Sequence, residues 1–296
     1  MPKALNSERE ETALAEPKTV LITGATDGLG KATALMLARN GYHVFATGRD
    51  GERRALLTAD ATTQNLPLET REMDVTSDES VARALDEIHS KAGPVDILIN
   101  NAGIGIIAAM EEISFADLHK QLETNFFGVV RVTQHVLPDM RSRRRGRIIN
   151  MSSISGVWSV PLFGPYSSSK FALEAISDAW RLELAPFGVR VILIEPAYIP
   201  TSMADRSRAL SASYFEKPDS PYATVYSSFL KRWRSSTEKS RAVPDDCARV
   251  ILRALRDSSP RARYTVTREA RVASLLKRLL TDRTRDRIVL KGFGGR

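Results

Sequence analysis

The sequence has almost no cysteine. Cys247 is the only one in 296 residues, which excludes an intramolecular disulfide framework and a zinc site made of several thiolates. The four histidines are scattered without the spacing of metal ligands, so we expect no metal. A chain without disulfides suits a reducing compartment, and we expect the protein to be cytoplasmic.

Long apolar runs are also lacking. Residues 104–110 form one of the longest, far short of the roughly 18 residues that a membrane-spanning helix needs. Residues 1–17 carry acidic side chains where a secretory signal would need an apolar core, so we interpret them as a disordered lead-in. With 43% apolar and 26% charged residues, the composition is typical of a soluble globular protein. Contact with a membrane surface stays open.

Acidic residues become scarce after position 200. Residues 1–200 hold 21 Lys and Arg against 25 Asp and Glu, whereas residues 201–296 hold 22 against 10. All of the excess positive charge, a net +8 over the chain, therefore lies in the last third. Such an excess can mark a nucleic-acid site, a membrane contact or a solvated surface.

Apolar segments alternate with helical patterns along the first 200 residues. Strands are expected at 18–23, 43–47, 68–74, 95–100, 147–152 and 190–195, and helices at 29–40, 77–92, 126–141 and 167–187. This alternation predicts an α/β fold, a doubly wound parallel sheet of the Rossmann type with about seven strands and helices on both faces. Several strands are nearly continuous apolar runs, as expected for strands buried on both faces.

The regular alternation of strands and helices ends after position 200. Residues 200–243 mix Ser, Arg and Pro with aromatic side chains, and a helix at 244–257, a short strand at 264–267 and a basic helix at 268–280 follow. The aromatic residues argue against disorder, so we interpret 200–243 as a substrate lid and 268–296 as a basic C-terminal tail. Both are assigned to a single domain at 18–296.

A glycine-rich turn follows the first expected strand. Residues 23–30 read T-G-A-T-D-G-L-G and open a helix. Gly24, Gly28 and Gly30 let the backbone turn tightly and approach a pyrophosphate, which the free N–H groups of the helix N-terminus bind. A purely structural turn is the alternative, but three glycines at this spacing between strand and helix favour a dinucleotide site.

The end of the second strand bears on the choice between NAD and NADP. An acidic residue there would bind the ribose hydroxyls and repel a 2′-phosphate. Arg49 instead offers a forked donor to that phosphate, so NADP(H) is predicted. Two features count against this prediction: Asp50 could face the ribose, and Asp27 in the glycine-rich turn carries the wrong sign for a phosphate site.

A tyrosine and a lysine, Tyr166 and Lys170, lie four residues apart on one face of an expected helix. A free tyrosine has a pKa of about 10 and is a poor acid–base catalyst near neutrality, but a nearby lysine cation lowers that pKa. Alone, such a pair is more often simply solvated. Ser153 strengthens the catalytic interpretation because it follows a buried strand, and parallel sheets bind ligands at the carboxyl ends of their strands.

Together these motifs resemble the short-chain dehydrogenases/reductases over residues 18–270. The matching stretches are 23–30, 74–75, 100–103, 125, 148–153, 166–170 and 196–201. The segment that begins at Asn125, together with 166–174, resembles the branch that contains the 17-beta-hydroxysteroid and retinol dehydrogenases.

The resemblance implies a role for each site residue. Tyr166 would exchange a proton with the substrate oxygen, and Ser153 would orient that oxygen. Lys170 would bind the nicotinamide ribose and lower the phenol pKa, while Asn125 would anchor a water that relays protons to Lys170. The implied cofactor-binding residues are Gly24, Thr26, Asp27, Gly28, Leu29, Gly30, Arg49, Asp74, Val75, Asn101, Ala102, Gly103, Tyr166, Lys170, Ile199 and Thr201. Among them Asp74 would accept from the adenine amine, Asn101 would contact the adenine ribose, and Ile199 and Thr201 would bind the nicotinamide carboxamide.

Several of these residues have a structural alternative. Asn125 could cap or kink its helix, the Asn100–Asn101 pair could tie neighbouring strands together, and Asp74 could be the N-cap of the next helix. The sequence also departs from the family at Ala197, where Pro-Gly is usual. Alanine has less backbone freedom than glycine, which bears on the contacts of the nearby nicotinamide residues.

Apolar stretches at 104–107 and 157–163 flank the expected catalytic residues. With the aromatic residues of 214–233 they are expected to line a pocket for a small apolar substrate, unless they pack the core or a subunit interface. We predict an NADP(H)-dependent interconversion of a carbonyl and an alcohol on a steroid-, retinoid- or lipid-like substrate. The alternatives are a reductase of a fatty-acyl or polyketide-like carbonyl and a non-catalytic NADP-sensing regulator.

Two basic segments invite other interpretations. Residues 141–147 resemble a nucleic-acid patch, but they fall at a helix C-terminus, where cations are favourable, so no nucleic acid is expected. In the C-terminal helix, basic residues surround an apolar stripe made of Val272, Leu275, Leu276, Leu279 and Leu280. Such a helix can lie on an anionic membrane, but packing over the pocket or against a partner subunit is favoured. A homo-oligomer is expected.

Overall fold

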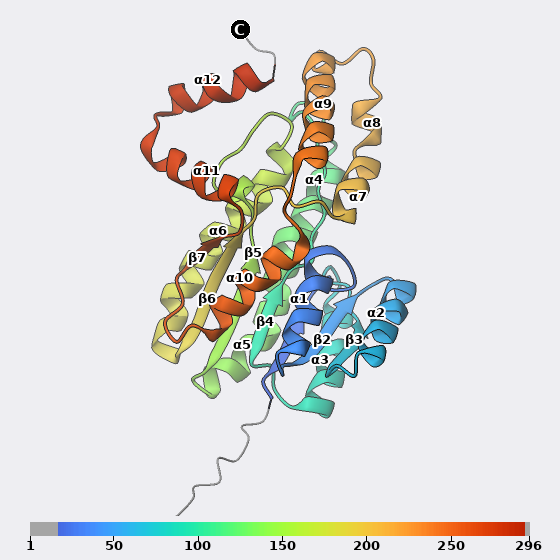
Figure 1. Cartoon of the computed structure of the whole chain (residues 1–296), viewed down its shortest axis with the longest axis vertical. Helices are drawn as coiled ribbons and strands as arrows, with labels where there is room; N and C mark the ends of the chain where they lie inside the picture. The colour runs from blue at the N-terminus through green and yellow to red at the C-terminus, as the bar shows by residue number, and fades with distance from the viewer. Residues whose placement is uncertain (1–16, 294–296) are drawn as a thin grey trace, which may run out of the picture.

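A seven-stranded parallel sheet forms the centre of the structure, a computed structural model that describes residues 17–293 (Figure 1). The strand order is β3-β2-β1-β4-β5-β6-β7, and every neighbouring pair is parallel. The strands are β1 (Thr19–Ile22), β2 (His43–Gly48), β3 (Leu68–Glu72), β4 (Ile97–Asn100), β5 (Gly146–Met151), β6 (Val189–Glu195) and β7 (Arg263–Thr265). The predicted doubly wound α/β fold is confirmed.

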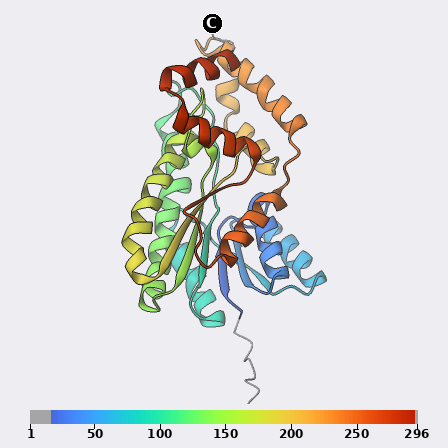
Figure 2. The same ribbon diagram turned by 60° about the vertical axis from the view of Figure 1, so that its left-hand side comes forward.

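Helices cover both faces of the sheet, as Figure 2 shows. One face packs on α1 (Gly28–Arg39), α2 (Gly51–Thr63) and α10 (Pro244–Arg256). The other packs on α3 (Asp78–Ala92), α5 (Gly128–Ser142) and α6 (Gly164–Leu184). Every residue of β1 and β4 is buried, because both faces of these central strands meet helices.

The helix expected at 126–141 has a more complex start than its apolar pattern indicates. A helix α4 (Phe115–Leu122) continues into a π-helical turn η1 (Glu123–Phe127) before α5 begins. The wider turn lies where Asn125 is buried, and π-helical turns of this kind are frequent at functional sites.

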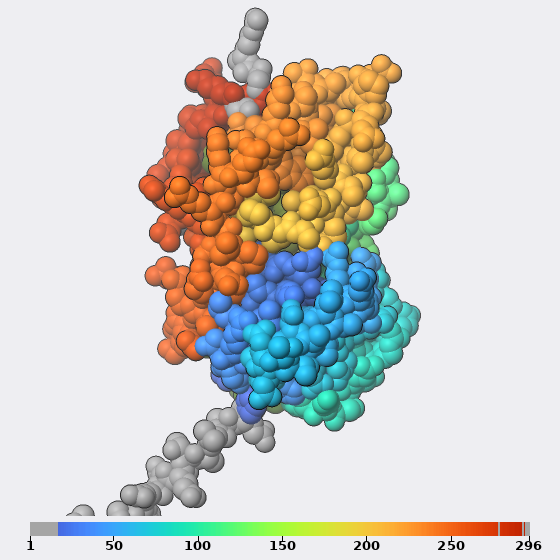
Figure 3. Space-filling view, turned by 45° about the vertical axis from the view of Figure 1, so that its right-hand side comes forward, coloured from blue at the N-terminus to red at the C-terminus, as the bar shows by residue number. Residues whose placement is uncertain are grey.

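The predicted lid is helical. Residues 200–243 contain α7 (Ser202–Leu210), α8 (Ala212–Phe215) and α9 (Ala223–Lys239). Their aromatic side chains pack against the apolar stretch at 104–109 in a third hydrophobic cluster, separate from the two that cover the sheet. Figure 3 shows this segment, in yellow and orange, lying directly on the N-terminal framework in blue.

Two further helices end the described chain. They are α11 (Arg268–Leu279) and α12 (Asp282–Gly292), and α11 contacts the 3-10 turn η2 (Ile154–Gly156) that follows β5. No helix within residues 17–293 is both long and apolar enough to cross a membrane. The predicted lead-in at 1–17 lies outside the described residues except for its last one, and residues 294–296 of the predicted tail also lie outside them.

Candidate active site

The predicted catalytic residues meet at the carboxyl ends of the central strands. The sheet order reverses between β1 and β4, and ligands bind doubly wound sheets in the crevice at such a switch point. Ser153 lies two residues after the end of β5, while Tyr166 and Lys170 lie in the first turns of α6, which packs on β6 and on the turn η2 that follows β5. The fold therefore brings these three residues together, as the sequence predicts.

Ser153 and Tyr166 share a hydrogen bond. Ser153 Oγ also accepts from the backbone N–H of Ser155 at 3.1 Å, and it lies 3.5 Å from the carbonyl oxygen of Pro196. These contacts hold the serine hydroxyl beside the tyrosine. The Tyr166 residue as a whole is partly exposed, whereas Ser153 is buried.

The pKa of Tyr166 differs from the expectation that Lys170 lowers it. Burial raises the pKa of Tyr166 to about 12, and the hydrogen bond with Ser153 opposes this only in part. Lys170 Nζ lies 5.7 Å from the centre of the tyrosine ring and donates to the carbonyl oxygen of Met151 at 2.7 Å. In the chain alone, dehydration of the phenol therefore outweighs the lysine cation, and Tyr166 is protonated at neutral pH.

A partly buried network of charges adjoins Lys170 on α6. Burial lowers the pKa of Lys170 to about 8, and the carboxylate of Glu174, one helical turn further along α6, opposes this shift. Arg263 on β7 donates to Glu174 at 2.9 Å and to Asp178 at 2.8 Å. The network thus places a paired carboxylate one turn from the catalytic lysine. The sequence reasoning missed it, although the spacing that joins Tyr166 to Lys170 also leads to Glu174.

Asn125 is completely buried in the π-helical turn. Its amide nitrogen donates to the carbonyl oxygen of Ile104 at 2.9 Å and to Ser169 Oγ at 3.2 Å, and its Oδ1 accepts from the backbone N–H of Ile104 at 2.9 Å. Both amide hydrogens are therefore used by the protein, which leaves one lone pair of Oδ1 from this side chain for a water. The relay role implied for Asn125 stays a prediction.

The glycine-rich turn has the shape of a phosphate cradle. Gly24 and Gly28 have φ values of +59° and +54°, in the left-handed region that favours glycine. A Cβ on Gly24 would lie 2.7 Å from Ala102 Cα, and one on Gly30 would lie 2.6 Å from the carbonyl oxygen of Gly24. The turn leads into α1, whose first turn presents backbone N–H groups that lack intrahelical acceptors. These residues fit the pyrophosphate of a dinucleotide.

The remaining residues of the turn and the β4 loop pack around this cradle. Asn101 donates to the carbonyl oxygens of Thr23 and Gly24 at 3.0 and 2.8 Å, so its amide ties β4 to the turn, as one alternative proposed. Asn100 in turn donates to Asn150 Oδ1 at 2.9 Å and joins β4 to β5. Leu29 belongs to the first turn of α1 and packs on the core. Thr26 lies beside Gly48, Val75 beside Gly128, and Gly103 beside Asn125.

Asp74 and Arg49 face each other beyond the ends of β3 and β2. Arg49 Nη1 lies 3.3 Å from Asp74 Oδ2, and Thr76 donates to Asp74 Oδ1 through its backbone N–H at 2.9 Å and its hydroxyl at 2.7 Å. Partial burial alone would raise the pKa of Asp74, but these hydrogen bonds and the Arg49 charge lower it. The alternative that Asp74 caps α3 is wrong, because Ser77 holds that position.

Asp50 and Asp27, the two acids that count against a phosphate site, both have cationic partners. Asp50 is the N-cap of α2, where it accepts from the backbone N–H of Arg53 at 3.1 Å. Asp27 Oδ2 accepts from Arg53 at 2.9 Å and from Arg206 of the lid at 2.7 Å, and also from Ser202. The negative charge of Asp27 is thus neutralised by two arginines that the sequence reasoning did not single out, since they are far apart in sequence.

The loop after β6 lies over the glycine-rich turn. A Cβ on Gly28 would lie 3.3 Å from Thr201 Cβ, which places Thr201 beside the cradle, and Ile199 is buried. Ala197 is not among the residues with positive φ, so alanine is accommodated there without backbone strain. The roles of Ile199 and Thr201 toward the carboxamide stay predictions.

Aromatic rings extend from the lid to the catalytic tyrosine. Phe163 contacts Tyr166 edge to face, with ring centres 6.1 Å apart, and Phe229 of α9 at 5.6 Å. Phe229 in turn contacts Trp233 at 5.2 Å. Leu162, before Phe163, has a φ of +69°, a strained conformation held by a hydrogen bond from the backbone N–H of Ala108. Residues of 104–109, with Leu162 and Phe163, therefore pack against the aromatic segment in one cluster, and Phe163 links that cluster to Tyr166.

Comparison with known proteins agrees with this geometry. Residues 18–211 match the short chain dehydrogenase family. A 3-ketodihydrosphingosine reductase of Bacteroides thetaiotaomicron is 43% identical over 195 residues, which cover 64% of this chain and 67% of that protein. Retinol dehydrogenase 8 of Bos taurus is 35% identical over 250 residues, covering 82% and 80%, and 17-beta-hydroxysteroid dehydrogenase type 1 of Homo sapiens is 32% identical over 269 residues, covering 89% and 81%.

A solved structure shows the same fold. A short-chain dehydrogenase from Streptomyces avermitilis superposes with a TM-score of 0.79 at 29% identity, over 93% of this chain and 95% of that one. These similarities confirm the resemblance to the branch that holds retinol and 17-beta-hydroxysteroid dehydrogenases. The chain belongs to the short-chain dehydrogenase/reductase family of oxidoreductases.

Proposed function

We propose that the protein uses NADPH to reduce the carbonyl group of a small apolar ketone or aldehyde to an alcohol. The observation that carries this proposal is the Tyr166 hydroxyl, hydrogen-bonded to Ser153, with Lys170 one turn away on α6 and an aromatic wall beside it. Carbonyl reduction needs a proton donor at the substrate oxygen, and a phenol beside a lysine cation that stabilises the resulting phenolate supplies one.

Each of the three catalytic residues has a separate role in the proposed reaction. Bound NADPH would supply a hydride to the carbonyl carbon. Tyr166 donates its proton to the carbonyl oxygen, and Ser153 orients and polarises that oxygen with a hydrogen bond. Lys170 binds the nicotinamide ribose and, as a cation, stabilises the phenolate that Tyr166 becomes. A solvent proton then restores the phenol, so one hydride and one proton are added to the substrate in each turnover.

Three features of the charged residues near the glycine-rich turn support NADP(H) over NAD(H). Arg49 is 65% exposed at the end of β2, where its guanidinium can turn toward a 2′-phosphate. Asp50 caps α2 and is therefore held toward Arg53 rather than toward a ribose. The charge of Asp27 is balanced by Arg53 and Arg206, so the acid in the glycine-rich turn does not repel a phosphate as an isolated carboxylate would.

The lid supports an apolar substrate. The wall next to Tyr166 consists of aromatic and aliphatic side chains, a lining suited to a lipid-like molecule with one polar group at the catalytic hydroxyls. The relative that is named a 3-ketodihydrosphingosine reductase favours a lipid ketone, and the one named a retinol dehydrogenase favours a retinoid. We infer that the substrate has a long apolar body, whether steroid-, retinoid- or acyl-like.

The test is a cofactor and substrate panel. The purified protein is mixed with NADPH or NADH and a series of apolar ketones and aldehydes, and loss of the reduced-nicotinamide absorbance is followed. We expect oxidation of NADPH, faster than of NADH, that increases with the apolar length of the substrate. Equal or faster use of NADH would contradict the cofactor assignment, and turnover confined to short polar carbonyls would contradict the substrate class. Tight NADPH binding without turnover of any carbonyl would favour the regulator.

A further inference from the structure

The last two helices stand at the same end of the molecule as the lid. Figures 1 and 2 both show α11 and α12, in red, at the end where α9 of the lid also lies. Residues 268–292 hold eight Lys and Arg against three Asp and Glu. The basic tail predicted from the sequence is therefore a helical structure beside the lid.

The apolar stripe of α11 is divided between two sides of the helix. Leu276 and Leu280 are partly buried, and α11 contacts the turn η2 of the body. Val272, Leu275 and Leu279 lie on the outer side and are 46%, 55% and 70% exposed. These three positions follow an i, i+3, i+7 spacing and so share one face of the helix. Packing within the chain, one of the two forms of packing favoured from the sequence, therefore involves at most two of the five stripe residues.

Exposed arginines lie on and beside this face of α11 and at the start of α12. Arg268 precedes Val272 by one turn, Arg271 precedes it directly, and Arg283 lies at the start of α12. An exposed apolar stripe on a folded protein marks a contact surface, and a basic border around it is typical of helices that lie in the interface of an anionic bilayer.

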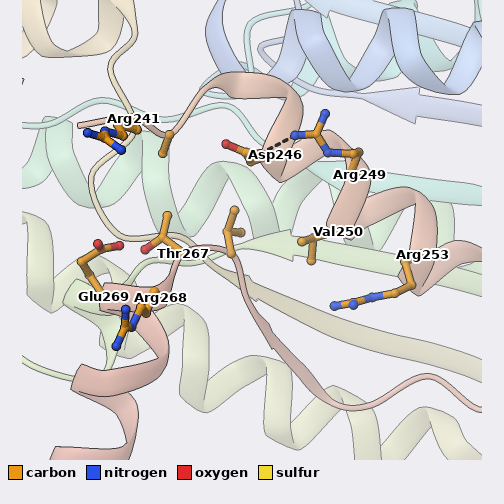
Figure 4. Close-up of a pocket in the computed structure, with 10 residues that line it drawn as sticks. Arg241, Asp246, Arg249, Val250, Arg253, Thr267, Arg268 and Glu269 are labelled. Atoms are coloured by element: carbon orange, nitrogen blue, oxygen red, sulfur yellow. Dashed lines mark hydrogen bonds and ion pairs between the residues drawn. The ribbon is translucent and has the colours of Figure 1, made fainter. Parts of the chain in front are cut away.

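An arginine-rich cleft continues the basic surface onto α10. The cleft, shown in Figure 4, has a volume of about 580 Å³, and Arg268 belongs both to it and to the first turn of α11. Its charged lining consists of Arg241, Arg249, Arg253, Arg268, Asp246 and Glu269. Four guanidinium groups against two carboxylates make this a cationic hollow that suits phosphate groups. It adjoins the α11 face, where a lipid surface would present its headgroups.

We propose that the outer face of α11, together with its basic border, docks the protein on an anionic lipid surface. A second copy of this chain fits the face poorly, because a two-fold contact there would bring two strongly basic surfaces together. An anionic bilayer complements both the charge and the apolar stripe. The docking does not depend on the chemistry proposed above, but it would bring the lid to the place where an apolar substrate is stored.

The experiment measures binding of the full chain to vesicles. Co-sedimentation is compared between vesicles of phosphatidylcholine alone and vesicles that also contain phosphatidylserine, each at low and high salt. We expect binding to the anionic vesicles only, weakened by salt, because the basic border supplies the attraction. Equal binding to both vesicle types, or to neither, would overturn the proposal.

Variants locate the surface. In the double variant Leu275→Glu with Leu279→Glu, binding to anionic vesicles should fall at least about tenfold, since apolar burial is lost and like charges are added. The control is Leu56→Glu on α2, which is 59% exposed in the wild type and should leave binding unchanged. Reduction of a water-soluble ketone, or an unchanged unfolding midpoint, shows that the double variant is folded. If the folded double variant bound anionic vesicles as tightly as the wild type does, the proposal would be overturned. It would also be overturned if the wild type were a dimer and the double variant, but not the control variant, were a monomer.

Discussion

At the scale of single residues, the site depends on how burial acts on two titrating groups. Burial raises the pKa of Tyr166 to about 12 and lowers that of Lys170 to about 8. Both shifts favour the uncharged forms, so near neutral pH the tyrosine keeps its proton while the lysine is close to losing one. The sequence places both residues correctly, but it carries no information on how thoroughly the fold dehydrates them.

The pKa of Lys170 predicts how the reaction depends on pH. Its pKa is lowered from 10.5, so the side chain is charged below about 8 and neutral above it. The rate of carbonyl reduction should therefore fall as the pH rises through about 8, because a neutral lysine no longer stabilises the phenolate. A pH profile of kcat/KM checks this. A profile that stays flat up to pH values near 10.5, the ordinary pKa of lysine, would contradict it.

Glu174→Gln should move that decline to lower pH. The carboxylate of Glu174 raises the pKa of Lys170 against the effect of burial, and glutamine removes its charge while keeping its shape. The matched control is Glu183→Gln, an exposed glutamate on the same helix, which should keep the wild-type profile. If Glu174→Gln lowered kcat/KM but left the pH at which it declines unchanged, Glu174 would act only through packing.

Arg49→Ala should weaken the preference for NADPH. A charged hydrogen bond to a phosphate contributes about 1.5–3 kcal/mol, which corresponds to tenfold or more in kcat/KM for NADPH. The value for NADH should change little, because NADH lacks the 2′-phosphate. Arg39→Ala, an exposed arginine that contacts Gln64, serves as the control. An equal loss of kcat/KM with NADPH and NADH would show that Arg49 does not bind the 2′-phosphate.

At the scale of elements, the strands and the helices that cover the sheet centre were predictable, and several others were not. Helix α10 presents five buried residues in an amphipathic pattern, and its predicted bounds agree with the structure to within one residue. In contrast, α2 buries only Leu57 and Ala61, and α9 of the lid buries only Tyr226 and Phe229. Helices with so few buried side chains leave no periodic apolar signal in the sequence. The π-helical turn at Asn125 also has no sequence signature.

A hydrogen bond joins the lid to the body and supports a stability prediction. Tyr226 is 2% exposed, accepts from the backbone N–H of Ala109 at 2.9 Å and donates to Glu112 at 2.9 Å. Tyr226→Phe leaves that buried N–H unpaired and should reduce the free energy of unfolding by about 1–3 kcal/mol. Denaturant unfolding measures this. The more exposed Tyr222→Phe should cost less, and equal costs would contradict the assigned importance of the lid bond.

At the scale of the whole molecule, the division of charge follows the division of structure. The portion up to position 200, with its slight acidic excess, forms most of the sheet and carries the catalytic residues, while the basic portion forms the lid, α10 and the terminal helices. The sequence places this boundary at position 200, and in the structure that position lies between β6 and α7. It did not predict that Arg206 of the basic portion would pair with Asp27 in the cofactor cradle, because that contact exists only once the lid has folded over the sheet.

The expected homo-oligomer also belongs to this scale. Phe127 in η1 and Phe171 in α6 are 49% and 41% exposed, on elements that contact each other, and this is the surface on which we expect a second copy to pack. Light scattering during gel filtration should therefore give a multiple of the 32.8 kDa chain mass. The double variant Phe127→Glu with Phe171→Glu should shift it toward the monomer. A wild-type monomer at all concentrations would contradict the prediction.

The central claim is that Tyr166 delivers the proton in NADPH-dependent carbonyl reduction, and the most direct test is the variant Tyr166→Phe. Single-turnover reduction is measured on the apolar ketone that the panel ranks highest, alongside NADPH binding followed by nucleotide fluorescence. Since a general acid contributes roughly 10²–10⁴ in rate, reduction should slow at least about a hundredfold, while the dissociation constant for NADPH stays within about twofold of wild type. Reduction at the wild-type rate by a variant that still binds NADPH would contradict the account.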